Sequence, residues 1–218
     1  MMNPIKKHKW LLVLLFIHLN TKAVLAQSKA DIFDGKTPVT WLGLDYTQAR
    51  FITPEIGTKS AFTITDAEFQ NTYIPAWNYL FMTEPKKYNV AKAIHRASVS
   101  YALSVTEKAN KAVKKEFLSK NPADYKTLTE QNIADLVKKY NFQGNTGIGM
   151  LFFVEGMSDR TETESAWVTF VDMQSKTVLF TVYLTDKIGG FGFRNHWADA
   201  NFRILRQIES DYATWARK

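Results

Sequence analysis

Three residues able to do chemistry, Arg194, Asn195 and His196, directly follow a glycine-rich turn at residues 189–192. They open a segment with helical periodicity, so the first backbone N–H groups and the helix dipole can receive an anion there. Arg194 could add a bidentate contact and His196 could donate a proton. The alternative interpretation is structural, with Asn195 capping the helix and the glycines permitting a tight turn.

A second candidate group surrounds Pro75, inside a segment whose apolar residues recur at helical spacing. Pro75 is expected to kink or divide this helix. Trp77, Asn78 and Glu84 could then line a groove beside the kink. The alternative places Trp77 in the core and makes Asn78 a turn or cap residue, since aromatic residues at helical spacing usually mark a buried face. With Arg194, Asn195 and His196, these residues complete the predicted ligand-binding set.

The sequence does not support a zinc site, a serine nucleophile or a phosphate-binding loop. After residue 26 the chain holds two histidines, His95 and His196, at a spacing unlike that of any zinc motif. It has no Gly-x-Ser-x-Gly turn and no phosphate-binding loop. We therefore predict no catalytic residue, no metal ligand and no cofactor. Asp45 and Asp172 are expected to cap strand ends or to border a crevice.

The amino-terminal residues have the pattern of a secretory signal. Lys6, Lys7 and Lys9 precede an apolar run at 10–19, and the short residues of 24–26 follow. A transmembrane anchor would need about 20 apolar residues. We expect a signal peptide at 1–26 that is cleaved after Ala26, and hence a periplasmic or secreted protein without a transmembrane segment.

The charge and the cysteine content of the chain argue against several classes of partner and of covalent attachment. Four lysines and no acid lie within residues 1–26, so more than half of the net charge of +7 disappears on cleavage. Nucleic acid binding is therefore not expected, because it usually requires a concentrated basic face. The chain has no cysteine, which excludes disulfides, thiolate metal sites and a lipid anchor on cysteine.

The residue pattern predicts strands and helices in alternation. A helix begins at Thr65, with Glu68 completing a capping box, and another begins at Thr129. The long final helix covers 195–215. The expected strands cover 39–52, 97–105, 148–155, 166–172 and 177–184, the last two forming a hairpin.

This order predicts one α+β or α/β domain at 38–218. We expect a mixed β-sheet of about five strands with helices packed on it and a long C-terminal helix. The nearly continuous apolar run at 148–154 is typical of a central strand that is covered on both faces. Residues 27–37 are polar and are expected to form a flexible leader.

The carboxy-terminal third is similar to a pattern of bacterial envelope proteins: an apolar strand at 147–154, a hairpin turning after Asp172, a glycine-bearing turn and a tryptophan-containing helix. It resembles the α/β domains of the TolB amino-terminal and CsgG-like group, although Ser175 and Lys176 replace the usual Thr-Gly turn. Segments 40–45, 77–84 and 190–197 also resemble an uncharacterised family of exported proteins in Gram-negative bacteria.

These resemblances imply a fold and a compartment and assign no activity. The sequence favours an exported, non-catalytic cell-envelope domain engaged in protein interaction or assembly, with an envelope protein or a second copy as partner. The alternative is a small anionic-ligand-binding protein or enzyme that uses the turn and helix start at 190–197.

Overall fold

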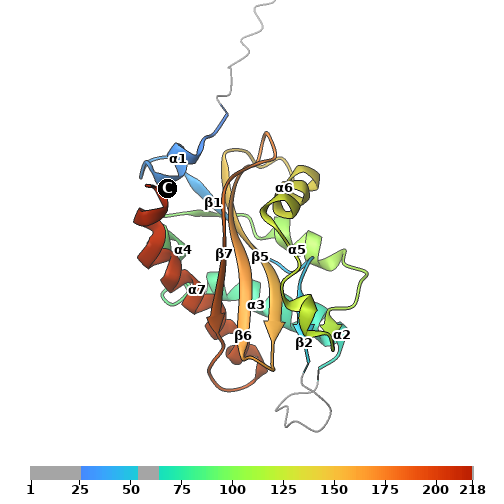
Figure 1. Cartoon of the computed structure of the whole chain (residues 1–218). Helices are drawn as coiled ribbons and strands as arrows, with labels where there is room; N and C mark the ends of the chain where they lie inside the picture. Colours follow the sequence, from blue (N-terminus) through green and yellow to red (C-terminus); the bar gives the residue numbers. More distant parts are fainter. Residues whose placement is uncertain (1–25, 54–63, 218) are drawn as a thin grey trace, which may run out of the picture.

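The computed structural model describes residues 26–53 and 64–217. The predicted signal peptide lies outside the described residues except for Ala26. The described chain forms a curled sheet between two layers of helices (Figure 1). This confirms the prediction of a single mixed α/β domain with a long C-terminal helix.

The sheet is organised around β5 (Ile148–Ser158). β6 (Thr163–Asp172) pairs antiparallel along one edge of β5, and β7 (Thr177–Lys187) continues the sheet beyond β6. The other edge of β5 pairs in parallel with β1 (Val39–Asp45) and then with β2 (Arg50–Ile52). The predicted strand at 39–52 is therefore two short strands, which occupy one position in the sheet.

Two very short strands close the far edge of the sheet. β3 (Ser100–Tyr101) pairs in parallel with β1, and β4 (Leu118–Ser119) pairs in parallel with β2. Every residue of β5 is buried, and the alternation of its side chains divides the core in two. Met150 and Phe152 belong to one hydrophobic cluster, whereas Leu151 and Phe153 belong to the other.

Helices cover both faces of the sheet (Figure 1). On one face lie α7 (Phe193–Trp215), α4 (Val90–Ala93) and α1 (Lys29–Phe33), together with α3 (Ile74–Thr83). On the other face lie α5 (Ser104–Lys111) and α6 (Glu130–Lys139). A short 3₁₀ turn, Pro122–Tyr125, precedes α6.

The capping predictions are confirmed. Thr65 accepts a hydrogen bond from the Glu68 amide, and Glu68 accepts one from the Thr65 amide, at the start of α2 (Asp66–Glu68). Thr129 caps α6 in the same reciprocal way, with Asn132 as its partner. Pro75 divides the long helical segment as expected, because a π-helical stretch, Phe69–Tyr73, separates α2 from α3.

The predicted strand at 97–105 is wrong. Only Ser100 and Tyr101 pair as a strand, and Ser104 begins α5. The physical reason lies in tertiary hydrogen bonds, because Thr106 donates to the carbonyl of Leu42 at 2.7 Å and Asn110 donates to that of Leu44 at 2.9 Å. These bonds anchor a helix against β1 and outweigh the local alternation of apolar and polar residues.

Residues 27–37 pack on the domain rather than forming only a loose leader. Ile32 of α1 is fully buried, and its carbonyl accepts a hydrogen bond from the Tyr212 hydroxyl of α7. Phe33 contacts the ring of Tyr212 with centroids 4.9 Å apart. Among the described residues, no helix is both long and apolar enough to cross a membrane.

Candidate functional site

The turn at 190–197 is closed by bonds within the protein. Gly192 caps α7 with a φ of 80°, a left-handed conformation that favours glycine, and its carbonyl accepts from the His196 amide at 2.9 Å. The His196 Nδ1 lies 3.4 Å from the carbonyl of Gly190. Arg194 Nη1 donates to Asn195 Oδ1 at 3.1 Å, and its Nη2 lies 3.8 Å from Glu84 Oε1.

Trp77 is a core residue that holds the turn at 190–197 in place through a hydrogen bond. It is fully buried, and its indole Nε1 donates to the carbonyl of Arg194 at 2.8 Å. Its ring stacks on Tyr73 at 5.8 Å between centroids and lies 6.1 Å from Phe193. The hydrogen bond joins α3 to the first turn of α7, so Trp77 positions the turn.

Asn78 faces away from this turn, toward the sheet. Its Oδ1 accepts from the Leu44 amide at 2.7 Å, and its Nδ2 donates to the Leu44 carbonyl at 3.0 Å. The two bonds satisfy a strand residue next to the irregularity at Gly43, where φ is 104°. A Cβ at Gly43 would lie 2.5 Å from Asn78 Oδ1 and 2.5 Å from Thr106 Oγ1. Asn78 therefore satisfies the backbone N–H and C=O groups of Leu44, next to the irregularity in β1.

Five of the six predicted residues therefore lie at the junction of α3 and α7, whereas Asn78 contacts β1. Each of them has a partner within the protein, although Gly192, and not Asn195, caps α7. Among the described residues, no group of three or more histidines and acids could hold a metal ion.

This chain matches no protein-family model, no curated protein and no solved structure. We therefore infer its function from the geometry of its own residues.

Asp45 and Asp172 take the roles expected of residues at strand ends. Asp172 Oδ1 accepts from the Gln174 amide at 2.9 Å and the Ser175 amide at 3.2 Å, which closes the β6–β7 turn. Asp45 is fully buried at the end of β1 and accepts from the Tyr140 hydroxyl at 2.6 Å. Burial raises the pKa of Asp45 above its ordinary value of 3.8, and hydrogen bonds from Thr47 and Tyr140 oppose this rise only in part.

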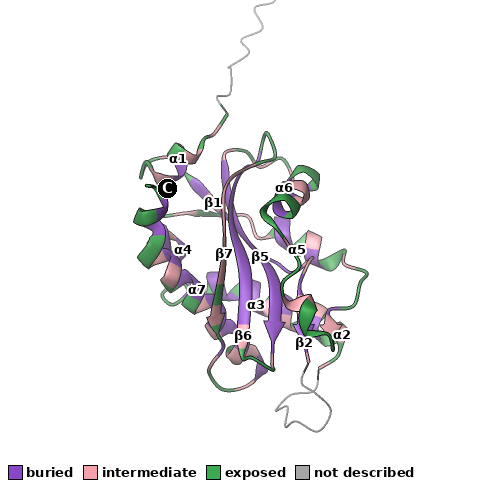
Figure 2. Ribbon diagram, in the orientation of Figure 1, coloured by how far each residue is buried: buried purple, intermediate pink, exposed green. Residues whose placement is uncertain are grey.

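A surface that the site prediction missed is the outer edge of β7. Within the described residues β7 pairs only with β6, and in Figure 1 it lies at the front of the sheet between α7 and α6. Figure 2 shows it partly exposed, whereas β5 and β6 are buried. The strand is eleven residues long, and no charge occurs before Asp186.

The direction of the β7 backbone follows from two bonds. Ile188 donates to the carbonyl of Glu162, on the side of β6. The carbonyl of Thr185 accepts from the side chain of Gln207. Since backbone groups alternate between the two edges of an antiparallel strand, Thr181 and Tyr183 present their N–H and C=O groups outward. The sequence signal for this surface is the uncharged, strand-prone run at 177–185.

Proposed function

We propose that this chain is an exported, non-catalytic cell-envelope domain that works by protein interaction or assembly, with the outer edge of β7 as its contact surface. The single observation that carries the proposal is the outer edge of β7, which is uncharged over residues 177–185 and has no strand partner in the described structure. Native proteins usually protect such edges with charges, prolines, bulges or covering segments, because an open edge pairs readily with another strand.

The properties of β7 favour a second copy of this chain as the partner. Residues 177–185 contain no charged side chain, so antiparallel pairing of two such edges places no like charges opposite each other. A two-fold axis through such a pair makes the same surface serve both partners. The two sheets would then join into one.

The side chains on both faces of β7 pack against other parts of the protein, and a register shift at Leu179 separates residues 177–178 from the rest of the strand. Phe180 lies edge-on to Phe33 of α1 with ring centroids 5.9 Å apart, on the α7 side of the sheet. On the other side, Tyr183 packs on Trp167 at 5.3 Å, and the amino group of Lys126 lies 4.2 Å from its ring centroid. Side chains on both faces of β7 are therefore held by contacts within the protein, and no described strand pairs with its outer edge.

Export is supported by the sequence features at 1–26: the basic start, the apolar run and the short residues before Gln27. The absence of cysteine leaves no residue for a thioether lipid anchor. The partner in this proposal is therefore encountered outside the cytoplasm.

Light scattering during size-exclusion chromatography tests the contact surface. We expect the purified protein to reach twice the mass of one chain as its concentration rises. Thr181→Pro removes an outward N–H without touching the bonds between β7 and β6, and proline is tolerated on such an edge. This variant is expected to stay monomeric while its circular dichroism remains that of the folded protein.

Thr181→Val is the matched control. Both substitutions remove the hydroxyl of Thr181, which lies 2.8 Å from that of Thr169, but valine retains the backbone N–H. We expect the valine variant to assemble like the unaltered protein. A protein that is monomeric at every concentration, or a dimer that survives Thr181→Pro, would contradict the assignment of the β7 edge.

A further inference from the structure

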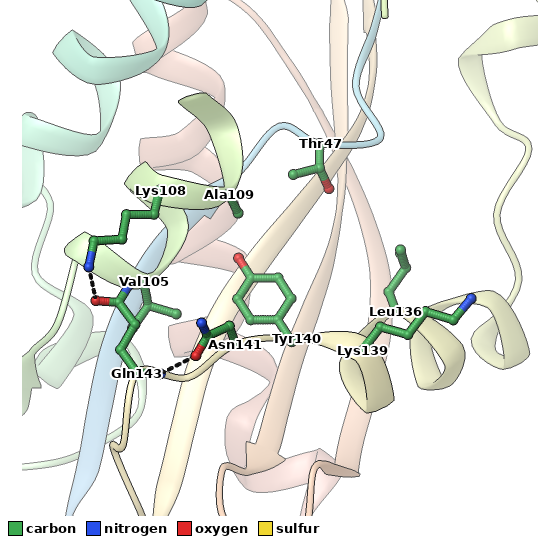
Figure 3. A pocket seen from close by; sticks show the side chains of 9 residues that line it. All are labelled: Thr47, Val105, Lys108, Ala109, Leu136, Lys139, Tyr140, Asn141 and Gln143. Carbon is green, nitrogen blue, oxygen red and sulfur yellow. Dashed lines mark hydrogen bonds between the residues drawn. The ribbon is translucent and has the colours of Figure 1, made fainter. Parts of the chain in front are cut away.

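A cavity of about 350 Å³ opens between α5 and the end of α6, close to the carboxyl end of β1 (Figure 3). Its volume lies within the range of small-molecule sites, which is roughly 300–1,000 Å³. None of the six ligand-binding residues predicted from the sequence contributes to it. Its lining comprises Thr47, Val105, Lys108, Ala109, Leu136, Lys139, Tyr140, Asn141 and Gln143.

The centre of the cavity is apolar, and contacts within the protein hold its tyrosine ring. Figure 3 shows the ring of Tyr140 between Val105 and Ala109 on one side and Leu136 on the other. The Tyr140 hydroxyl donates to the buried carboxyl of Asp45 at 2.6 Å. The ring also packs on Phe142, with centroids 5.2 Å apart. The position of the Tyr140 ring is therefore fixed by Asp45 and Phe142.

The rim of the cavity is polar and basic. Two lysines and no acid occur among the nine lining residues. Gln143 holds Lys108 in place, because Gln143 Oε1 accepts from Lys108 Nζ at 2.8 Å while Gln143 Nε2 donates to the Ser104 carbonyl at 2.8 Å. On α6, Asp135 is paired with Lys138 at 3.1 Å, and Lys138 does not line the cavity.

We propose that this cavity binds an amphipathic organic anion, an apolar chain or ring that carries a carboxylate. The apolar part lies on Tyr140, Ala109 and Leu136, where it leaves water. The carboxylate is met by the ammonium group of Lys139, since Lys108 already donates to Gln143. Figure 3 shows the two lysines at opposite ends of the apolar centre. A cation of the same shape is repelled by both lysines.

The position of the cavity agrees with the architecture of the sheet. It lies beside the carboxyl end of β1, and ligands of open α/β sheets bind in crevices outside the carboxyl ends of parallel strands. The inference requires neither export nor the pairing of β7, so it stands or fails independently of the function proposed above.

Isothermal titration of the purified protein with sodium octanoate tests the proposal. Sodium acetate has the same charged group without the chain, and octylammonium chloride has the chain with the opposite charge. We expect saturable binding of one octanoate per chain and no binding of acetate or octylammonium. An octanoate titration without saturable heat, or equal binding of octylammonium, would overturn the proposal.

Three variants locate the site. Ala109→Phe fills the apolar centre and is expected to abolish octanoate binding, with circular dichroism showing that the fold is retained. Lys139→Met is expected to weaken binding by about twofold to fivefold, the usual range for an exposed ion pair. Lys138→Met removes the same charge one residue away from the cavity and is expected to leave binding unchanged. Octanoate binding that persists in Ala109→Phe, or that Lys138→Met weakens as much as Lys139→Met, would assign the octanoate to another place.

Discussion

The backbone nitrogen of Gln27 lies 3.1 Å from Oδ2 of Asp172, which joins two residues 145 positions apart in the chain. The same aspartate closes the β6–β7 turn through its other oxygen. If the signal peptide is cleaved after Ala26, as we propose, this nitrogen becomes the amino terminus. The hydrogen bond from an amide to the carboxylate would then become an ion pair between an ammonium group and the carboxylate.

Asp172→Asn is expected to lower the free energy of unfolding of the chain that begins at Gln27 by about 1–2 kcal/mol, since asparagine keeps the oxygen that closes the turn but loses the charged acceptor. Urea unfolding measures the change. A chain that begins at Lys29 lacks the partner of this carboxylate, so the same substitution is expected to cost less there. Equal costs in the two chains would show that the contact with Gln27 contributes nothing.

Expression of the whole chain in a Gram-negative host tests export directly. We expect the periplasmic or secreted product to begin at Gln27 when its mass is measured. Ala26→Arg places a long charged residue where a small one is required, and it is expected to leave the longer precursor associated with the membrane. A mature protein that still begins at Met1 would contradict the signal peptide.

Glu164 should make stability depend on pH. This β6 residue is fully buried, neither of its carboxyl oxygens has a hydrogen-bond partner in the described structure, and burial raises its pKa well above 4.5. Because the folded state holds the proton more tightly than the unfolded state, its contribution to stability is complete below pH 4.5 and is lost as the pH rises through the folded pKa.

Glu164→Gln cannot ionise, so we expect it to unfold at higher urea concentrations than the unaltered protein at pH 8. The two should converge near pH 4. Between those limits the difference is expected to grow by up to about 1.4 kcal/mol for each pH unit. Parallel unfolding curves across the whole pH range would contradict a raised pKa for Glu164.

Removal of the Tyr140 hydroxyl should destabilise the end of β1. Tyr140→Phe leaves the buried Asp45 without this donor, at an expected cost of about 1–3 kcal/mol in the free energy of unfolding. Combining it with Asp45→Asn removes much of the charge penalty, so the double variant is expected to be more stable than the sum of the single costs predicts. Thermal and urea unfolding of the four proteins measure this coupling.

Two residues that the sequence placed in one site should respond very differently to substitution. Asn78→Leu removes the acceptor for the buried Leu44 amide and is expected to cost about 1–3 kcal/mol. Glu84→Gln breaks only the exposed 3.8 Å contact with Arg194, and exposed ion pairs contribute about 0–1 kcal/mol. Urea unfolding of both variants distinguishes a structural residue from a surface residue.

Local patterns predicted the elements that are determined locally. The capping box at Thr65, the division of the helix at Pro75 and the buried run of β5 each depend on neighbours in the sequence, and all three are confirmed. The sequence could not show that residues 46–49 interrupt the first strand while both halves still pair with β5. That outcome depends on a partner strand more than a hundred residues later.

The cavity beside Tyr140 could not be predicted from the sequence for the same reason. Tyr140 follows Ile133 and Val137 at helical spacing, which indicates a buried helix residue, and nothing local indicates that its hydroxyl contacts Asp45. Lys108 and Lys139 lie on separate helices, so only the fold brings them to one cavity. The sequence shows that residues 177–185 are uncharged, but it does not show that this strand lies at the edge of the sheet.

The pairing of β1 with β5 also constrains when the domain can fold. Val39 has Ile148 as its partner, so the centre of the sheet cannot close until most of the chain has been synthesised. Domains that depend on such distant contacts fold slowly, because a long loop must be ordered first. If the chain is exported, as we propose, that delay would leave the early segments extended and able to cross a membrane before the sheet forms.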